Sequence, residues 1–311
     1  MFTTMHATTA AAVSAKLTAL RRASGALTFT RVLTLIIVAD DLAGAERGIQ
    51  AANGASREHP CRIIAVVAGE TGDGPASIDA QIRVGGDAGL SEVVILQPRG
   101  GPADAIDTLV MPLLLPDAPI VVWWTGRPPT VPSRDPLGAM AQRRITDVTA
   151  CDDPLETLRS LAPGYAPGDT DLAWARVTLW RGLLAATLDE PPHEPITAVR
   201  VTGADQRPSV YILAAWLADS LGVPVEIGVE QSRAITRVEL DRAPGPITLR
   251  REPGASVAYL SRPGRIDMRI NLPERTLADC LTEELRRLDA DETYGRVLTR
   301  GLPLVTPPKE Q

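Results

Sequence analysis

The stretch Ile120-Val-Val-Trp-Trp-Thr-Gly-Arg-Pro-Pro129 gives the clearest indication of the fold class. Its first five residues form an apolar run between Pro119 and Gly126, which is typical of a buried β-strand. Adjacent side chains of a strand point to opposite faces, so Trp123 and Trp124 do not share a face. We expect one ring to pack inward and the other to face the crevice at the carboxyl end of the strand, where open α/β sheets bind ligands and partners. The alternative is that both rings belong to the core, because tryptophan is highly buried on average.

The chain before this stretch alternates between strands and helices. Residues 31–39 and 61–68 are near-continuous apolar runs of the kind buried in parallel sheets, and residues 42–57 between them are expected to form a helix. Residues 78–84 alternate apolar and polar side chains, which predicts an antiparallel insertion. We therefore predict an α/β fold in which residues 1–165 form a doubly wound, Rossmann-like domain. It lacks a dinucleotide fingerprint, because no G-x-G-x-x-G motif follows any of its strands.

The second half of the chain has a different pattern. One helix is predicted over residues 171–188, with Asp171 as its N-cap, inside a helix and linker region at residues 166–195. Beyond it, strands separated by Pro-Gly turns come at short intervals between residues 236 and 272, which predicts an antiparallel meander. Together with its flanking helices, this meander predicts a C-terminal α+β domain over residues 196–311.

The composition narrows the class of protein. A formal net charge of −6 argues against a general nucleic-acid binder, which would be basic. The chain has no run of 18 apolar residues and no pattern of a secretory signal peptide near its start, so we expect a cytoplasmic protein with no membrane partner. Its only lysines, Lys16 and Lys309, lie near the two ends, which argues against a catalytic Schiff-base lysine or a P-loop.

A search for catalytic and metal-binding motifs finds none. The sequence has no P-loop, no G-x-S-x-G and no H-E-x-x-H, and its three histidines stand apart from one another. Its three cysteines are also far apart, without C-x-x-C or metal-ligand spacing. The sequence motifs therefore offer no candidate for a catalytic residue, a metal site or a cofactor site.

Arginine and histidine side chains suggest where an anion could bind. Arg57 and His59 lie between a predicted helix end and a strand, and Arg143 follows the Trp123-Trp124 loop. Arginine grips phosphate or carboxylate groups through two parallel hydrogen bonds, so these three residues are candidates for binding a phosphorylated metabolite. The alternatives are that His59 caps the last carbonyls of its helix and that the arginines form ion pairs with other side chains.

Tryptophan and arginine also suggest a surface for a protein partner, because both residue types are enriched at interface hot spots. Trp123, Trp124 and Arg127 are the first candidates, since they lie where a strand opens into a loop. Arg176 and Trp180 are the second, because residues four apart on a helix could stack. The alternative for this second pair is a helix that docks the two domains together.

Six segments spread over nearly the whole chain resemble one protein family, the glucose-6-phosphate dehydrogenase assembly proteins called OpcA. The segments are Arg31–Val38, Ala51–Arg62, Trp123-Trp124, Asp171–Arg181, Ala214–Asp219 and Glu283–Asp289. The resemblance implies a non-catalytic protein that binds glucose-6-phosphate dehydrogenase and promotes its assembly or allosteric activation. That enzyme belongs to the oxidative pentose phosphate pathway and makes NADPH. The resemblance supplies no site residues.

Two other functions stay open at this point. One is a sugar-phosphate hydrolase or isomerase that uses the crevice beside Trp123-Trp124 together with His59. The other is a sensor that binds a phosphorylated metabolite through arginines and relays this binding to a partner.

Overall fold

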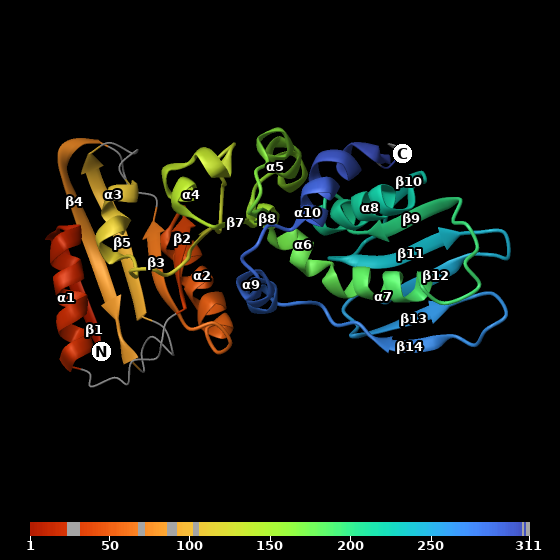
Figure 1. Ribbon diagram of the computed structural model, residues 1–311, viewed down its shortest axis with the longest axis horizontal. Coiled ribbons are helices and arrows are strands. Elements are labelled where there is room, and N and C mark those ends of the chain that lie inside the picture. Colours follow the sequence, from red (N-terminus) through yellow and green to blue (C-terminus); the bar gives the residue numbers. More distant parts are fainter. Residues whose placement is uncertain (24–31, 68–71, 86–91, 102–105, 307, 309–311) are drawn as a thin grey trace. The chain divides into compact units, whose positions relative to one another are not determined.

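The structure, a computed structural model, describes residues 1–23, 32–67, 72–85, 92–101, 106–306 and 308 (Figure 1). Arg31, expected to begin the first strand of the parallel sheet, lies outside the described residues. Contacts divide the chain into two compact units. The first unit comprises Met1–Ala150, Gly168–Leu172 and Leu277–Ala290; the second comprises Cys151–Pro167, Ala173–Thr276 and Asp291–Gln311. Each unit contains one multi-stranded sheet, so the fold is mixed α/β with two sheets.

The first unit is built on an eight-stranded sheet in the order β1-β4-β5-β3-β2-β6-β7-β8. Its strands are β1 (Phe2–Thr8), β2 (Leu33–Ala39), β3 (Cys61–Val67), β4 (Gly72–Arg83), β5 (Glu92–Gly101), β6 (Ile120–Trp124), β7 (Arg143–Thr146) and β8 (Asp169–Asp171). From β5 to β8 all neighbours are parallel, whereas β4 and β1 pair antiparallel. His6 lies in β1, which pairs with β4.

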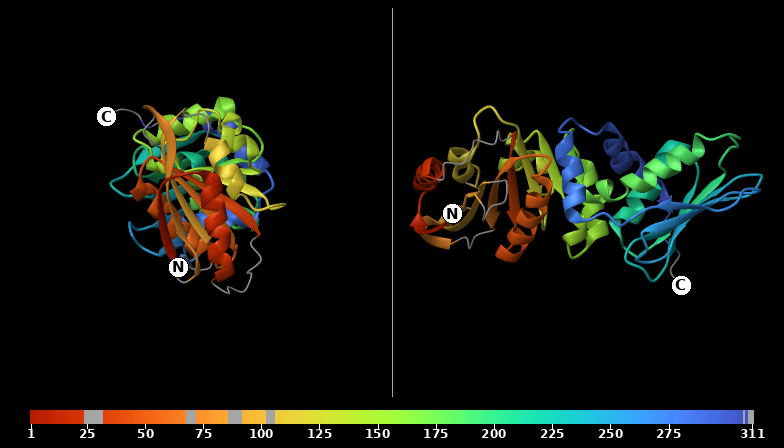
Figure 2. Two further views of the ribbon diagram at one scale, coloured as in Figure 1. Left: turned by 90° about the vertical axis from the view of Figure 1, so that its left-hand side faces the viewer. Right: turned by 90° about the horizontal axis from the view of Figure 1, so that it is seen from below.

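The helices of the first unit cover this sheet. They are α1 (Ala10–Ala23), α2 (Leu42–Ala55), α3 (Ile106–Val110), α4 (Pro136–Met140) and α9 (Leu277–Arg286), with short 3-10 turns η3 (Met111–Leu113), η4 (Pro132–Arg134) and η5 (Val148–Ala150). Figures 1 and 2 show α1 along the edge formed by β1 and β4. Asp41 is the N-cap of α2 and accepts from the backbone N of Gly44 at 2.6 Å, which satisfies one of the donors at the start of that helix.

Helix α9 comes late in the sequence but packs in the first unit against α2. Gly54 permits this contact, because a Cβ there would lie 2.9 Å from the Cβ of Ala278. Arg286 of α9 donates to Glu58 at 3.0 Å, just beyond the end of α2. The C-terminal third of the chain therefore contributes one helix to the N-terminal sheet.

The long helix predicted over residues 171–188 is interrupted in the structure. Asp171 directly precedes the first of its two parts; it ends β8, is fully buried, and accepts from the hydroxyl of Thr146 at 2.6 Å and the backbone N of Val148 at 3.0 Å. Helix α6 (Leu172–Arg176) and helix α7 (Thr178–Leu188) follow, separated at Val177, whose φ of −96° and ψ of 4° leave the helical region. The prediction of one continuous helix was therefore wrong at Val177, where the backbone leaves the helical region.

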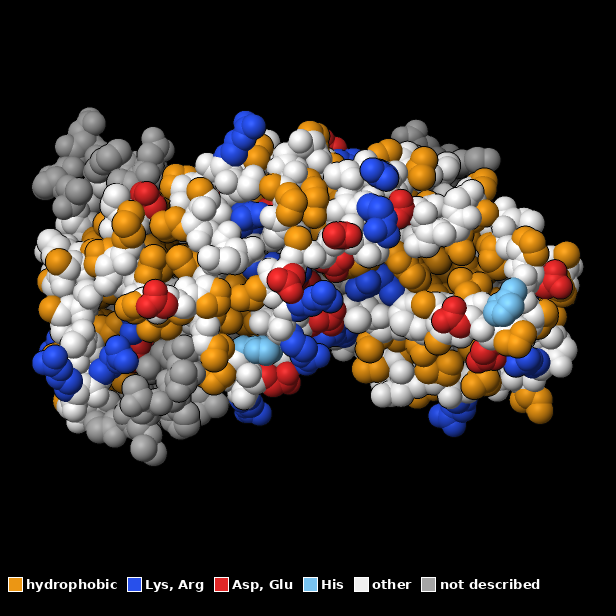
Figure 3. All heavy atoms as spheres, in the orientation of Figure 1, with side chains coloured by type: hydrophobic (Ala, Val, Ile, Leu, Met, Phe, Trp, Pro, Cys, Tyr) orange, Lys and Arg blue, Asp and Glu red, His pale blue; other side chains and the backbone are white. Residues whose placement is uncertain are grey.

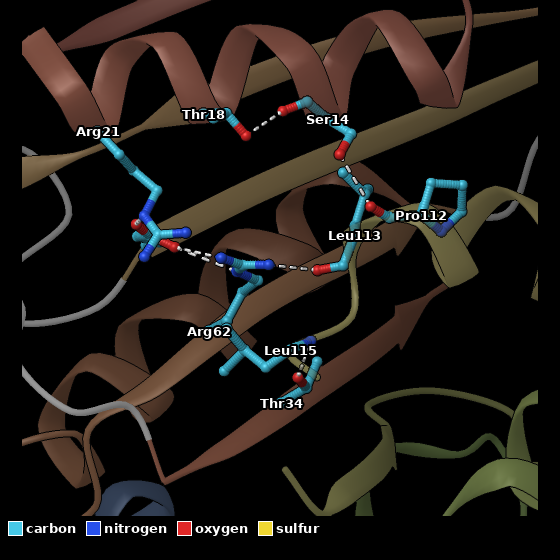
Figure 4. A network of polar contacts seen from close by, with 9 residues as sticks. Ser14, Thr18, Arg21, Thr34, Arg62, Pro112, Leu113 and Leu115 are labelled. Atoms are coloured by element: carbon cyan, nitrogen blue, oxygen red, sulfur yellow. Dashed lines mark hydrogen bonds and ion pairs between the residues drawn. The ribbon is translucent and has the colours of Figure 1, made fainter. Parts of the chain in front are cut away.

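A buried ion pair fixes the β3–β5 part of the first sheet. Arg62 of β3 donates to Glu92 of β5 through Nε at 3.1 Å and Nη2 at 2.9 Å, and its Nη1 donates to the carbonyl of Leu113 at 2.6 Å (Figure 4). Arg21 of α1 lies 2.9 Å from the other oxygen of Glu92. Ser14, also on α1, donates to the carbonyl of Pro112 at 2.9 Å. This network ties α1 and the η3 turn to two strands of the sheet.

An ion pair at the surface of the same unit makes its stability depend on pH. Arg83 donates to both carboxylate oxygens of Glu46, one of them at 2.9 Å, and this hydrogen bonding lowers the pKa of Glu46 although partial burial opposes it. A lowered pKa stabilises the fold above the ordinary pKa of glutamate, and this stabilisation is lost as pH falls through the lowered pKa.

We therefore expect Glu46→Gln to lower the free energy of unfolding at pH 7 by less than about 1 kcal/mol, since the side chain of Glu46 is 40% exposed and solvent screens the pair. The difference from the wild type should shrink as pH falls below about 4.3. Urea unfolding between pH 3 and 7 measures this difference in the free energy of unfolding, with Glu194→Gln, a change at an exposed glutamate, as control. A difference that grows on acidification would contradict this assignment.

The second unit contains a seven-stranded sheet in the order β14-β13-β12-β11-β9-β10-β15. Its strands are β9 (Ala198–Gly203), β10 (Val225–Val229), β11 (Ile235–Asp241), β12 (Ile247–Arg251), β13 (Val257–Ser261), β14 (Met268–Asn271) and β15 (Val305–Thr306). From β11 to β14 consecutive strands pair antiparallel, whereas β9, β10 and β15 are parallel. Strand β9 also pairs antiparallel with β11.

Helices α5 (Pro154–Leu161), α8 (Pro208–Leu221) and α10 (Glu292–Arg296) complete the second unit, with the 3-10 turns η6 (Ala162–Gly164) and η8 (Leu302–Leu304) and the short π-helix η7 (Val297–Gly301). Helix α8 connects β9 to β10 and is buried over most of its length, which explains its nearly continuous apolar sequence. It ends at Gly222, whose φ of 66° lies in the left-handed region that glycine adopts readily. Among all the described residues, no helix is long and apolar enough to cross a bilayer.

Candidate functional site

The two adjacent tryptophans of β6 are both in the interior of the first unit. Trp123 is 0% exposed and Trp124 is 3% exposed. Trp124 belongs to the hydrophobic core together with Val122 of its own strand and Leu137 of α4. The expectation that one ring faces an open crevice was therefore wrong. The physical reason is that β6 pairs with β2 on one side and β7 on the other, and α4 contacts it.

Arg127, the third residue of that candidate surface, is exposed in the loop after β6. Its backbone N donates to Asp40, which follows β2, at 3.3 Å. Gly126 lies next to the same carboxylate: a Cβ there would be 2.1 Å from Asp40 Oδ2. The loop after β6 is thus held to the loop after β2, and Arg127 is presented from a fixed backbone.

The candidate anion site in the first unit is not available in the form predicted. Arg143 is buried, pairs with Glu284 and donates to the carbonyl of Asp289 at 2.8 Å, so it anchors α9 to β7. Burial lowers the pKa of His59; Glu58 opposes this and Arg286 adds to it. A histidine with a lowered pKa is mainly neutral at pH 7 and contributes little charge to anion binding. Of the three candidates, only Arg57 is exposed.

The Arg176–Trp180 stack predicted from helical spacing is replaced by two other contacts. The helix break at Val177 shifts the register, so that Arg181 lies over the Trp174 ring at 3.3 Å from its centroid and Arg251 lies 5.4 Å from the centroid of Trp180. Trp180 is 3% exposed, so it is a buried residue of the second unit and not an exposed interface residue. The sequence pattern could not reveal Arg251 as its partner, because the two residues are 71 positions apart on different elements.

Arg176 and Trp180 nevertheless meet in one pocket of the second unit. The pocket contains about 490 Å³ of space, part of it open to solvent. Its charged lining residues are five arginines and one glutamate, namely Arg176, Arg207, Arg233, Arg251, Arg275 and Glu274. This arginine pocket gathers positive charge in a chain whose net charge is −6.

Sheet topology explains why residues so far apart in sequence meet here. Strands β9, β12 and β14 run in one direction and β11 runs against them. Arg207 follows the carboxyl end of β9, Arg251 ends β12, Glu274 follows β14, and Arg233 precedes β11. All four therefore lie at one edge of the second sheet. Gly203 allows the close approach of β9 and β11 at this edge, because a Cβ there would lie 2.7 Å from the carbonyl of Ala234.

Arg251 is the most buried of the five arginines. Its side chain is 4% exposed, and it donates to the carbonyls of Leu272 at 2.9 Å and Ile235 at 3.2 Å. Its nearest carboxylate in the pocket, Glu274, is 3.8 Å away and half exposed. Burial lowers the pKa of Arg251, and Glu274 opposes that shift. The guanidinium is thus fixed in position by neutral acceptors while its charge is only partly compensated.

The chemistry of this lining suits binding better than acid–base catalysis. Among the described residues that line the pocket there is no histidine, cysteine, lysine or aspartate; Glu274 and Ser209 are the only groups resembling a base or nucleophile. Across the described chain, no group of three or more His, Cys, Asp and Glu side chains could hold a metal ion. On the face drawn in Figure 3, basic and acidic side chains lie intermixed, unlike the continuous basic stripe of a nucleic-acid binder.

Comparison with known proteins relates both halves of the chain to one family. Residues 52–163 match the family model described as glucose-6-phosphate dehydrogenase subunit N-terminal domain, and residues 167–298 match the corresponding C-terminal domain. A curated relative from Synechococcus elongatus, the putative OxPP cycle protein OpcA, is 33% identical over 189 residues, covering 57% of this chain and 40% of that protein. The chain therefore spans about two fifths of that relative's length.

A solved structure, trehalose-6-phosphate from E. coli bound with UDP-2-fluoro glucose, covers 64% of this chain and 65% of its own. Its sequence identity is 10% and its TM-score 0.25, which is too low to support any conclusion about fold or function.

Proposed function

The chain belongs to the OpcA family of glucose-6-phosphate dehydrogenase assembly proteins, and on that premise we propose that it binds glucose-6-phosphate dehydrogenase and promotes its assembly or activation. The observation that carries this proposal is the match of two successive domains of one family, over residues 52–163 and 167–298. Through this partner the chain would support NADPH production in the oxidative pentose phosphate pathway, in the cytoplasm.

We propose further that the chain itself is not an enzyme. The arginine pocket supports this, because its lining offers donors and positive charge but few groups that could move a proton. The rival hydrolase or isomerase would require His59 and the crevice beside the tryptophans. Trp123 and Trp124 are buried, and His59 lies near Glu58 and Arg286. That rival therefore lacks the open site it needs.

For the partner surface, Arg127 is the strongest remaining candidate of the original group, because it is exposed and its backbone is held by Asp40. A side chain presented from a fixed loop loses little conformational entropy on binding. Arg176 is a second candidate, since it lines the arginine pocket and is partly exposed. The buried tryptophans would contribute only by holding these elements in place.

We expect Arg127→Ala to weaken binding of the dehydrogenase by about thirtyfold, the effect of losing one hot-spot side chain worth about 2 kcal/mol. The melting temperature should stay unchanged, because the side chain is exposed. Titration calorimetry of the full chain with the dehydrogenase measures the affinity, with Arg22→Ala, an exposed arginine at the end of α1, as the matched control. Unchanged affinity for Arg127→Ala would place the interface elsewhere, with Arg176→Ala as the next variant.

A further inference from the structure

We propose that the arginine pocket of the second unit binds a phosphate monoester, a small metabolite whose phosphoryl group is taken up by the arginines at the N-terminus of α8. The proposal concerns this chain alone and does not depend on the dehydrogenase being its partner.

The first observation is the charge of the pocket. Five guanidinium groups and a single carboxylate line one concave space, and that carboxylate, Glu274, is half exposed. Like charges around a partly enclosed space repel one another, and an anion bound among them reduces this repulsion. A phosphate monoester carries up to two negative charges and three oxygen acceptors on one group, so it can bind several guanidinium groups at once.

The second observation is the helix that opens at this pocket. Helix α8 has 14 residues, and its first backbone N–H groups and its macrodipole place partial positive charge at the N-terminus. Its N-cap residue is Arg207, which lines the pocket; the carbonyl of Arg207 accepts from the backbone N of Val210 at 2.9 Å, but its side chain makes no capping hydrogen bond and has no acceptor atom. A cation at this end of a helix opposes the dipole. An anion bound there would interact favourably with both the helix and Arg207.

The third observation is Arg251, a buried cation whose position is fixed before any ligand binds. Two carbonyl oxygens hold its guanidinium, at 2.9 and 3.2 Å, and its side chain is 4% exposed. Because these acceptors are neutral and Glu274 is 3.8 Å away, Arg251 retains positive charge that a bound anion could neutralise in a poorly solvated setting. Its contact with the ring of Trp180 adds an apolar wall beside the charge.

The size of the pocket limits the ligand to a small molecule. The enclosed space is only about 70 Å³ and the rest of the hollow is open to solvent, so the pocket can surround a group the size of a phosphoryl group while the attached carbon skeleton extends toward solvent. Leu179, which lines the pocket and is 37% exposed, supplies apolar surface for that skeleton. The ligand class that fits is therefore a phosphorylated metabolite of a few carbon atoms.

The test is titration calorimetry of the full chain with glycerol 3-phosphate, glycerate and glycerol at matched ionic strength. We expect saturable binding of glycerol 3-phosphate, binding of glycerate at least about tenfold weaker, and no binding of glycerol. The double variant Arg207→Gln with Arg233→Gln should weaken binding of glycerol 3-phosphate by about thirtyfold or more, since it removes two charged donors.

The matched control is Arg250→Gln. Arg250 neighbours Arg251 on β12 but points to the other face, is 49% exposed and pairs with Glu252 at 2.7 Å. This variant should bind like the wild type. Thermal unfolding establishes that all variants are folded, and Arg251 is left unchanged because its carbonyl contacts support the fold. Absence of saturable binding of glycerol 3-phosphate, equal binding of glycerate, or an unchanged affinity in the double variant would each overturn the proposal.

Discussion

Trp124→Ala is expected to lower the free energy of unfolding by about 3–5 kcal/mol, the usual cost of truncating a large aromatic side chain in a core. Trp124 is 3% exposed and packs in the hydrophobic core of the first unit with Val122 and Leu137. Truncation would leave a cavity between β6 and α4, because a Cβ added at Gly138 would already lie 3.2 Å from the Trp124 ring. Because the backbone packs closely against the ring, removing the ring removes these packing contacts and destabilises the fold.

Urea unfolding followed by circular dichroism measures this effect, with Arg127→Ala, from the loop that follows β6, as the control. The control should unfold like the wild type, because Arg127 is exposed and contributes to the loop through its backbone. The pair of variants also separates stability from partner binding. If Trp124→Ala left the midpoint of unfolding unchanged while weakening binding of the dehydrogenase, the ring would be a surface residue and the assignment to the core would be wrong.

Glu92→Ala is expected to cost about 3–5 kcal/mol of stability, because it leaves the buried guanidinium of Arg62 without its carboxylate. Glu92 is 0% exposed and the side chain of Arg62 is 6% exposed. Burial lowers the pKa of Arg62 and the charge of Glu92 raises it again, so the carboxylate is what allows the cation to stay inside. Arg21 would lose its contact with Glu92 at the same time.

Two further variants separate the ion pair from simple loss of packing. Arg62→Met combined with Glu92→Leu removes both charges while keeping volume, and it should be clearly more stable than Glu92→Ala alone. Glu252→Ala breaks an exposed pair with Arg250 and should cost less than about 1 kcal/mol. Denaturant unfolding of all three chains provides the comparison. Equal stability of Glu92→Ala and Glu252→Ala would show that the buried pair does not hold β3 and β5 together.

The parts of the fold that depend on local patterns were predictable from the sequence. The apolar runs that became β2, β3 and β6 are buried strands because every residue position in them, or nearly so, faces a covered side of the sheet. The cap of α2 at Asp41 follows from the same kind of local chemistry. A mixed α/β fold with two sheets follows from the order of such segments.

Features that depend on distant partners were not predictable in this way. The hydrogen bonds that Asp171 accepts from Thr146 and Val148 join segments more than twenty residues apart, and no local pattern indicates them. Burial of both Trp123 and Trp124 depends on the elements around β6 and not on the strand itself. Helix α9 has a clear amphipathic pattern, yet nothing in that pattern indicates that it packs against α2.

The arginine pocket shows the same limit for the candidate site. Sequence analysis identified Arg176 and Trp180 because they lie close together in the chain. It could not identify Arg207, Arg233 or Arg251. These residues meet in the pocket only because the strand directions place the end of β9, the start of β11 and the end of β12 side by side. Conversely, an arginine that the sequence suggested for anion binding can be paired inside the protein: Arg143 forms an ion pair with Glu284 in the first unit.

The rate at which glucose-6-phosphate dehydrogenase from the same organism produces NADPH, measured with and without the purified chain, tests the central proposal most directly. We predict that the initial rate, or the affinity for glucose 6-phosphate, rises with added chain until it saturates, and that the chain alone produces no turnover of glucose 6-phosphate or its lactone. No effect on the dehydrogenase at saturating concentrations, or a turnover by the chain alone that survives re-purification and is lost in His59→Ala, would contradict it.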